Sequence, residues 1–246
     1  MNLTALFDLT GRTALVTGAR TGIGRAAAWA LAGAGADVVG LGPRPMPETR
    51  ADVEARGRRF HEVRADLAAP QDFAALVASI EAEFAPIDIL VNNAGIIRRA
   101  DALDFTEADW DAVMTVDLKS LFFLTQAVAR SMVARGCAGR IVSIASLLSF
   151  QGGIRVPSYT AAKHGVAGLT RLLANELAPK GITVNAIAPG YIATDNTTAL
   201  RDDPVRSRQI LERIPLGRWG EVDDLATAVI FLASPASSYV TGVILP

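Results

Sequence analysis

The chain has 246 residues, half of them hydrophobic, and its 24 basic and 25 acidic side chains nearly cancel, so it can bury a sizeable core. The absence of long single-sign charge runs argues against a nucleic-acid partner. Because Cys137 is the only cysteine, an intramolecular disulfide is excluded, and a reducing, cytoplasmic environment is expected. We also expect no secretory signal, no membrane span and no bound metal.

Short apolar runs alternate with segments of helical period along the chain. The predicted strands span residues 13–17, 37–41, 59–64, 87–92, 140–146 and 183–189, and a last one begins at Tyr239. The predicted helices span residues 23–34, 70–84, 106–134, 159–177 and 221–232. This alternation predicts an α/β fold, a three-layer doubly wound sheet of about seven parallel strands, in a single domain over residues 1–246. The loops at 42–47, 98–104, 147–158 and 191–203 should gather where ligands bind in such sheets.

The first predicted strand runs into a glycine-rich turn, from Gly18 to Gly24, at the start of the first predicted helix. Glycines let the backbone approach a ligand closely, and a helix N-terminus favours an anion. The turn therefore predicts a dinucleotide site, although its G-x-x-x-G-x-G spacing differs from the usual fingerprint. The alternative is a turn that only packs the helix on the sheet.

Tyr159 and Lys163 are four residues apart at the start of a predicted helix and share one face. With only three tyrosines and three lysines in the chain, such a pair would rarely arise by chance. An ammonium beside a phenol stabilises the phenolate, which suits the pair to proton transfer. Ser146, at the end of the predicted strand 140–146, could hold a carbonyl oxygen in place. The alternative is a surface pair and an ordinary strand-end serine.

Together these residues resemble the short-chain dehydrogenase/reductase family. The match covers almost the whole chain and rests on the turn from Thr17 to Gly24, Asp66, Asn92-Asn93-Ala94-Gly95, Ser146, Tyr159, Lys163 and Pro189-Gly190. The resemblance implies a Rossmann fold, an NAD(P)-dependent dehydrogenase and a homotetramer. It also implies that Tyr159 exchanges a proton with the substrate oxygen, which Ser146 orients. Lys163 would assist Tyr159 and hold the nicotinamide ribose.

The resemblance assigns a set of cofactor-binding residues. They are Gly18, Arg20, Thr21, Gly22, Ile23, Gly24, Arg44, Asp66, Leu67, Asn93, Ala94, Gly95, Tyr159, Lys163, Pro189, Gly190, Ile192 and Thr194. The second predicted strand ends in Leu41-Gly42-Pro43-Arg44, without the acid that binds the ribose of NAD, and Arg20 and Arg44 favour NADP. Members of the family that resemble this chain along most of its length usually use NAD(H). We therefore expect NAD as the cofactor, and NADP stays possible.

One position departs from the family. Asp117 stands where the family usually has a catalytic asparagine. An ionised carboxylate there would strengthen the hold of Lys163 on its proton and alter the proton relay. Asp117 is therefore a catalytic candidate, and the alternative is a structural role through its main-chain carbonyl. A second departure is that the chain stops at Pro246, inside the last predicted strand, so the family's C-terminal tail is expected to be absent.

Segments 96–103, 146–159, 188–197 and 214–220 more closely resemble the 2-deoxy-D-gluconate 3-dehydrogenases, also called 2-dehydro-3-deoxy-D-gluconate 5-dehydrogenases. That resemblance implies hydride transfer at a deoxy sugar acid in uronate breakdown. Because arginine binds carboxylates well, we expect Arg155, with Arg98, to bind the substrate carboxylate and Gln151 to bond a hydroxyl. The alternative is that these arginines form loop or subunit salt bridges.

Two rival functions remain at this point. One is another short-chain reductase, such as a 3-oxoacyl-carrier-protein reductase, which would use Arg98, Arg99 and Arg155 to bind an acidic carrier. The other is a nicotinamide-binding protein without catalysis, because a fold does not by itself fix an activity. The complete set of Ser146, Tyr159 and Lys163 argues against the second rival, and Asp117 is its only support.

Overall fold

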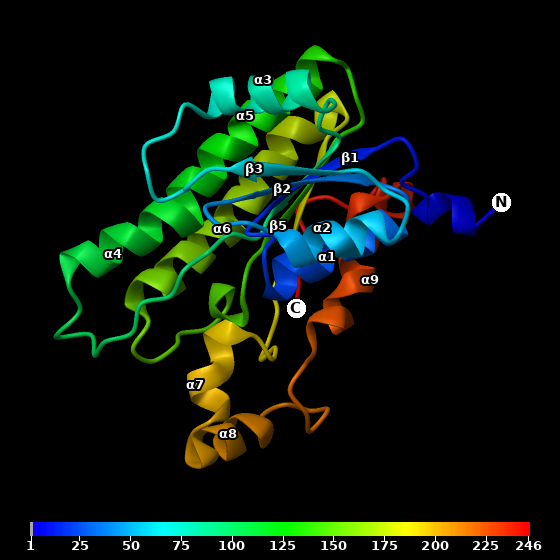
Figure 1. Ribbon diagram of the computed structural model, residues 1–246. Helices are drawn as coiled ribbons and strands as arrows, with labels where there is room; N and C mark the ends of the chain where they lie inside the picture. Colours follow the sequence, from blue (N-terminus) through cyan, green and yellow to red (C-terminus); the bar gives the residue numbers. More distant parts are fainter. Residues whose placement is uncertain (1) are drawn as a thin grey trace.

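A parallel sheet forms the centre of the computed structural model, which describes residues 2–246 (Figure 1). Its strands are β1 Thr13–Thr17, β2 Asp37–Gly42, β3 Phe60–Arg64, β4 Ile89–Asn92, β5 Arg140–Ile144, β6 Thr183–Ile187 and β7 Ile244–Leu245. They lie in the order β3-β2-β1-β4-β5-β6-β7, which confirms the predicted doubly wound sheet of seven strands. The order reverses between β1 and β4, and this is the place where ligands bind in such sheets.

Helices cover both faces of the sheet (Figure 1). They are α1 Gly22–Gly33, α2 Pro47–Glu54, α3 Phe73–Glu83, α4 Glu107–Met114, α5 Leu121–Ala134, α6 Pro157–Leu177, α7 Thr198–Arg201, α8 Pro204–Leu211 and α9 Ala226–Ala233. One buried cluster joins the sheet to α1 and α9, and a second joins it to α3, α5 and α6. Helices α7 and α8 project beyond the carboxyl ends of the strands, away from these two layers.

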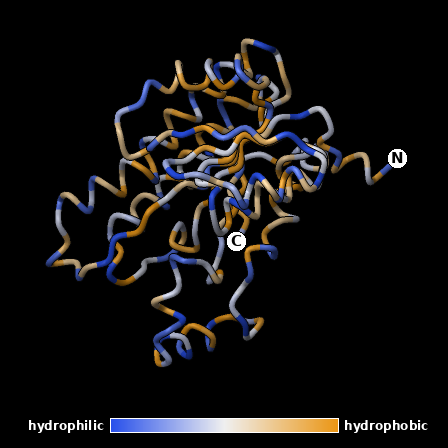
Figure 2. The backbone as a smooth tube through the Cα atoms, viewed as in Figure 1, coloured by the Kyte–Doolittle hydropathy of each residue, from blue (hydrophilic) through white to orange (hydrophobic). Residues whose placement is uncertain are grey.

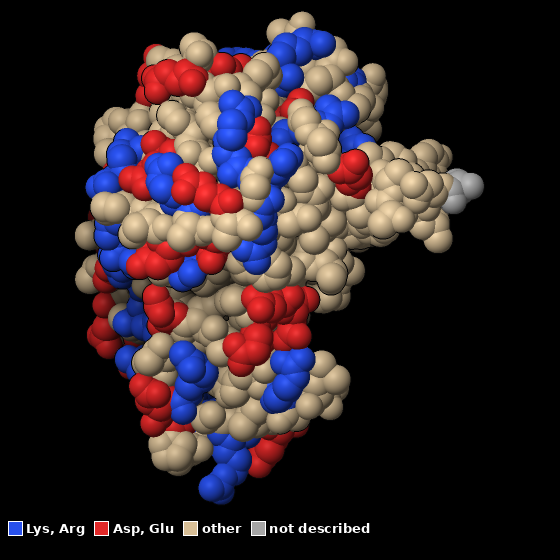
Figure 3. Space-filling model, turned by 45° about the vertical axis from the view of Figure 1, so that its right-hand side comes forward, with Lys and Arg blue, Asp and Glu red and all other residues tan. Residues whose placement is uncertain are grey.

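The continuous apolar runs became strands because both faces of the sheet are covered. Every residue of β1, β4 and β6 is buried. In Figure 2 hydrophobic residues recur along the central strands and along the helices, and hydrophilic residues recur along the outer turns. The face drawn in Figure 3 carries basic and acidic side chains interspersed, with no extended field of one sign.

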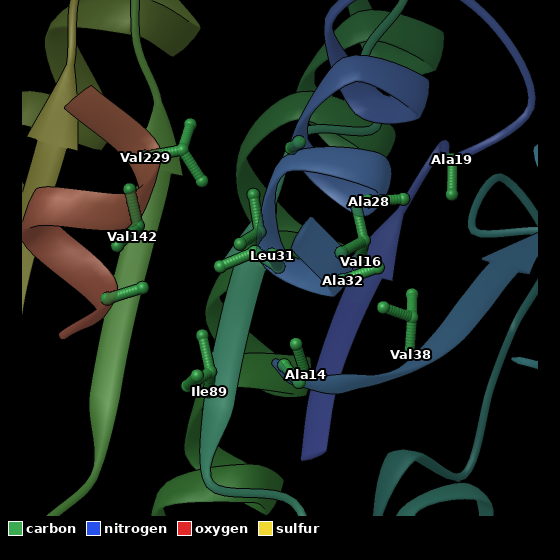
Figure 4. Close-up of a cluster of buried hydrophobic side chains, with 14 of the residues drawn as sticks. Ala14, Val16, Ala19, Ala28, Leu31, Ala32, Val38, Ile89, Val142 and Val229 are labelled. Atoms are coloured by element: carbon green, nitrogen blue, oxygen red, sulfur yellow. The ribbon is translucent and has the colours of Figure 1, made fainter. Parts of the chain in front are cut away.

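The core between the sheet and α1 shows how the strands are held in register. Ala14 of β1 lies beside Val38 of β2 and Ile89 of β4. Leu31 of α1 packs over these strands, and Val229 of α9 covers the neighbouring part of the sheet (Figure 4). Small side chains on α1 let this helix lie close to the sheet, so its N-terminus stays beside the end of β1.

Several predicted boundaries were wrong. The helix predicted from residue 70 begins at Phe73, because the side chain of Asp72 accepts the N–H of Ala75 at 3.0 Å and caps it there. The last strand does not begin at Tyr239, which is fully exposed, but is limited to Ile244–Leu245. Strand β5 ends at Ile144, two residues earlier than predicted. Helices α2, α7 and α8 were not predicted; each is short, and most of its residues are not buried.

The helix predicted over residues 106–134 is continuous but not uniform. Thr106 caps it by accepting the N–H of Asp109 at 3.2 Å, and a π-helical segment, Thr115–Ser120, separates α4 from α5. By length and composition alone, Glu107–Ala134 could cross a membrane. However, 56% of its most apolar stretch of 18 residues is buried inside the protein. Leu124, Val128 and Met132 are fully buried against the sheet, so the apolar residues of this helix belong to the core.

Candidate active site

A first cavity of about 490 Å³ opens at the carboxyl ends of β1, β2 and β4. Most of the predicted cofactor-binding residues line it. These are Gly18, Arg20, Thr21, Gly22, Ile23, Arg44, Asp66, Leu67, Asn93, Ala94, Gly95 and Thr194. The cavity thus lies at the reversal of strand order, where a dinucleotide is expected. Other residues that line it were not predicted, among them Gly42, Ile96, Val116 and Asn196.

The glycine-rich turn fits a pyrophosphate. Gly18 and Gly22 have φ values of 65° and 57°, which favour glycine. A Cβ on Gly24 would collide with the carbonyl oxygen of Gly18 and with the side-chain nitrogen Nδ2 of Asn93. Helix α1 can therefore start this close to the end of β1 only with glycine at this position. Gly24 itself is buried and does not line the cavity. The turn leaves the first N–H groups of α1 beside open space, where an anion is favoured.

Asn93 holds the turn in this shape. Its Nδ2 donates to the carbonyl oxygens of Thr17 and Gly18 at 3.0 and 3.3 Å, and the hydroxyl of Thr17 accepts the N–H groups of Asn93 and Ala94, both at 3.0 Å. These bonds tie the end of β1 to the end of β4. The segments at 17–24 and 92–95, which both resemble the family, therefore form one structural unit. The sequence showed the order of the two segments but not their contact.

The outer part of this cavity carries positive charge. Arg20 and Arg44 both line it, and neither forms an ion pair within residues 2–246. Asp66 also lines it and accepts the N–H of Ala68 at 2.9 Å. The end of β2 contributes Gly42 and no acid. The residues present thus fit a dinucleotide, and the two free guanidinium groups suit a ribose that carries a phosphate.

A second cavity, of about 210 Å³, lies beside the first and is of a size for a small molecule. Ser146, Tyr159 and Gln151 line it together with Pro189 and Gly190. Because β5 ends early, Ser146 is not the last residue of a strand but the N-cap of a short 3₁₀ helix, and its Oγ accepts the N–H of Leu148 at 3.1 Å. Its hydroxyl hydrogen stays available to a ligand oxygen.

Lys163 lies beneath Tyr159 and is almost fully buried. Its Nζ donates to the carbonyl oxygen of Ile144 at 2.8 Å and lies 5.3 Å from the centre of the Tyr159 ring. Ser149 holds helix α6 in place by donating its hydroxyl to the carbonyl oxygen of Lys163 at 2.6 Å. The structure thus brings together the tyrosine, the lysine and the serine that the sequence singled out, on β5, its following loop and the start of α6.

Asp117 also belongs to this group. Its carboxylate is fully buried, with Oδ1 accepting the N–H of Ile96 at 2.8 Å and Oδ2 3.8 Å from Nζ of Lys163. Oδ2 has no hydrogen-bond partner within the described residues. Burial raises the pKa of Asp117 above its usual value, and the nearby Lys163 and the Ile96 N–H oppose that rise. The π-helical segment that contains Asp117 is the irregularity that places this side chain here.

The two arginines predicted to bind the substrate do not line the second cavity. Arg155, at a left-handed φ of 64°, is 3.2 Å from Asp101, and Arg98 is 3.2 Å from Asp109. Arg98 lines the first cavity, and Arg155 is not among the described residues that line either cavity. Arg155 thus pairs with a loop residue and Arg98 with a residue of α4, and salt bridges of this kind were the alternative interpretation. Ile192 also lines neither cavity; its place is in the short bridge to Gly220.

Two arginines that the sequence did not assign to the substrate line the second cavity instead. Arg99 follows β4, and Arg206 is on α8. Tyr191 and Asn196, from the loop after β6, complete that wall. Arg99 could have been found as the neighbour of Arg98, whereas no signal pointed to Arg206, because α8 was not predicted. Within residues 2–246, no group of three or more His, Cys, Asp or Glu side chains is arranged to hold a metal ion.

Comparison with known proteins decides the family. A family model described as Enoyl-(Acyl carrier protein) reductase matches residues 18–246. The 2-dehydro-3-deoxy-D-gluconate 5-dehydrogenase of Escherichia coli (strain K12) is 56% identical over 236 residues, covering 96% of this chain and 93% of that protein. The chain belongs to the short-chain dehydrogenase/reductase family. The prediction of an NAD(P)-dependent dehydrogenase with a Rossmann fold is thereby confirmed.

Solved members of the short-chain dehydrogenase/reductase family share this architecture. A putative 2-deoxy-D-gluconate 3-dehydrogenase from Agrobacterium tumefaciens, with bound NADP, is 59% identical, with a TM-score of 0.92 over 98% of this chain and 96% of that one. A gluconate 5-dehydrogenase from Burkholderia cenocepacia J2315, in complex with NADP and tartrate, is 41% identical, with a TM-score of 0.93 over 98% and 95%. The seven-stranded sheet and its flanking helices are therefore those of the family.

Proposed function

We propose that this protein transfers a hydride between a nicotinamide cofactor and C5 of a deoxy sugar acid, as a 2-dehydro-3-deoxy-D-gluconate 5-dehydrogenase. The observation that carries the proposal is the second cavity, which joins Ser146 and Tyr159 to two arginines and has no acidic residue among those that line it. Such a cavity favours a small anion that carries a carbonyl or hydroxyl group. The name of the relative that is 56% identical over nearly the whole chain supports the same substrate.

The chemistry follows from the positions of three side chains. When bound in the first cavity, the nicotinamide would supply or accept the hydride. Tyr159 gives its hydroxyl proton to the substrate oxygen during reduction and takes it back during oxidation. Ser146 donates its hydroxyl to that oxygen and holds the carbonyl in place. Lys163, fixed by the carbonyl oxygen of Ile144, stabilises the tyrosine after it has lost its proton.

Asp117 acts in this proposal through its neighbours. It holds the loop after β4 by accepting the N–H of Ile96, and it places a carboxyl group 3.8 Å from Lys163. At that distance the charge of the carboxyl group acts directly on the ammonium of Lys163. Asp117 is thus a positioning residue for Lys163 and for the loop that lines both cavities.

A substrate panel tests the proposed function. Purified protein is mixed with NADPH or NADH and with 3-deoxy-D-glycero-2,5-hexodiulosonate, and the absorbance of the reduced nicotinamide is followed at neutral pH. The proposal predicts oxidation of the cofactor that falls by at least a hundredfold in Tyr159→Phe, because the proton donor is lost. Oxidation with acetoacetyl thioester and none with the sugar acid would instead support the rival acyl-carrier reductase. Binding of NADPH without turnover of either compound would support the rival without catalysis.

We also propose that the protein is a cytoplasmic homotetramer. A single cysteine suits a reducing compartment. The outer sides of three helices expose large apolar side chains, Trp110 on α4, Phe123 on α5 and Leu172 on α6. Apolar side chains of this size on neighbouring helices are typical of surfaces that a second subunit covers.

A further inference from the structure

Two arginines line the second cavity, and neither has an acidic partner within residues 2–246. Arg99 comes from the loop after β4, and Arg206 comes from α8, on the segment that follows β6. Each guanidinium has five N–H donors. Within residues 2–246, Arg99 uses one hydrogen bond, to the carbonyl oxygen of Asn196 at 3.0 Å, and Arg206 uses one, to Oε1 of Gln209 at 3.1 Å. Most of their donors are therefore free.

The other nearby arginines differ in this respect. Arg98 and Arg155 are each 3.2 Å from a carboxylate and so have their charge compensated. Arg201, on α7, donates to the carbonyl oxygen of Thr194 and the hydroxyl of Thr198 and does not line the cavity. Of the basic side chains in this region, only Arg99 and Arg206 combine a place in the wall of the second cavity with an uncompensated charge.

We propose that Arg99 and Arg206 together bind the carboxylate of the substrate and so determine that the enzyme acts on sugar acids rather than on neutral sugars. This inference rests on the proposed function, because it assigns the second cavity to the substrate. In such a sugar acid the carboxylate carbon is C1 and the reacting carbon is C5, so the anion must be held away from Tyr159. Arg99 and Arg206 line the same cavity as Tyr159 but come from other elements, the loop after β4 and helix α8.

The two arginines come from different parts of the fold. Arg99 belongs to the part of the chain that the sheet holds, whereas Arg206 belongs to the segment that projects beyond the sheet (Figure 1). A carboxylate has two oxygens, and each can accept donors from a different guanidinium. An anion bound by both residues therefore also links α8 to the body of the enzyme.

Binding of two matched ligands tests the proposal independently of turnover. D-gluconate and D-glucitol share a carbon skeleton and differ in that only gluconate carries a carboxylate. Their affinity for the enzyme saturated with NADPH, a complex in which neither alcohol can be oxidised, is measured by calorimetry. We expect wild type to bind gluconate more tightly than glucitol. Arg99→Met and Arg206→Met should each weaken the binding of gluconate by about tenfold to a hundredfold. Neither variant should change the affinity for glucitol or for NADPH.

Arg208→Met is the matched control, because Arg208 is an exposed arginine on the same helix and does not line the cavity; it should bind gluconate as wild type does. Unchanged gluconate affinity in Arg99→Met and Arg206→Met would overturn the proposal, and so would wild type that does not bind gluconate. An equal loss of glucitol would show a structural role instead. A loss in Arg155→Met as large as in Arg99→Met would move the anion site to Arg155. Failure of the proposed function would appear separately, as absent turnover of the sugar acid.

Discussion

The buried carboxyl of Asp117 makes a prediction about pH at the scale of one residue. Burial raises its pKa in the folded protein above the value of 3.8 for a free carboxyl. Between these two pKa values the unfolded chain releases a proton that the folded chain keeps, so stability falls as pH rises through that window and stays lower above it. Asp117→Asn removes this loss, so its Tm relative to wild type should increase from pH 4 towards neutral pH.

Thermal unfolding across that pH range checks the prediction. Asp111→Asn is the control for the loss of a carboxyl group, because Asp111 is exposed on the neighbouring α4. If the Tm difference between Asp117→Asn and wild type shrank as pH rose, Asp117 would be a stabilising charge partner of Lys163, and the account of its burial would be wrong.

Arg44 makes a second prediction at this scale. It lines the outer part of the first cavity, and β2 ends without the acid that would bind an unphosphorylated ribose. Arg44→Met should raise the KM for NADPH by about tenfold and change the KM for NADH much less, because only the phosphate loses a charged partner. Steady-state kinetics with both cofactors gives the two values. Equal effects on both would show that Arg44 contacts a part that NAD and NADP share.

At the scale of elements, the junction of β1 and α1 depends on the absence of a side chain at Gly24. A Cβ there would collide with the backbone of Gly18, so Gly24→Ala should cost about 1–3 kcal/mol of stability and weaken NADPH binding. Gly168→Ala is the control, since nothing lies within 4 Å of the added Cβ in helix α6, and it should stabilise by about 0.5–1 kcal/mol. Unfolding in urea and NADPH titration would measure both effects. Wild-type NADPH affinity in Gly24→Ala would contradict the proposed cofactor turn.

The sequence predicted best those elements whose environment is uniform. Strands such as β1 and β6 are buried on both faces, so their apolar runs are continuous and unmistakable. It failed for α8, which is short and buries only Ile210, and with that helix it missed Arg206. It also could not place Asp117 against Ile96, because that contact needs a π-helical segment and joins residues 21 positions apart. Motif residues on rigid elements were predictable, whereas residues that reach the site from irregular segments were not.

At the scale of the whole molecule, the exposed apolar side chains on α4, α5 and α6 predict an assembly. Light scattering after gel filtration should give four times the 25.9 kDa mass of one chain. Phe123→Glu combined with Leu172→Glu should yield smaller species, because charges would be buried at a subunit contact. Leu103→Glu, at a fully exposed loop position, should leave the mass unchanged. A monomeric wild type would contradict the proposed tetramer. It would not change the assignment of the active-site residues, which all belong to one chain.

The fate of the hydride tests the proposed reaction at the level of single atoms. NADPH deuterated at C4, on one face and then on the other, is mixed with 3-deoxy-D-glycero-2,5-hexodiulosonate, and the product is analysed by mass spectrometry and NMR. With wild type, we expect one of the two labels to appear at C5 of 2-dehydro-3-deoxy-D-gluconate. Tyr159→Phe should bind NADPH but form little labelled product. Label at another carbon would contradict the proposed reaction, and so would unlabelled product with both deuterated forms of NADPH. Labelled product formed by Tyr159→Phe at the wild-type rate would contradict the role of Tyr159.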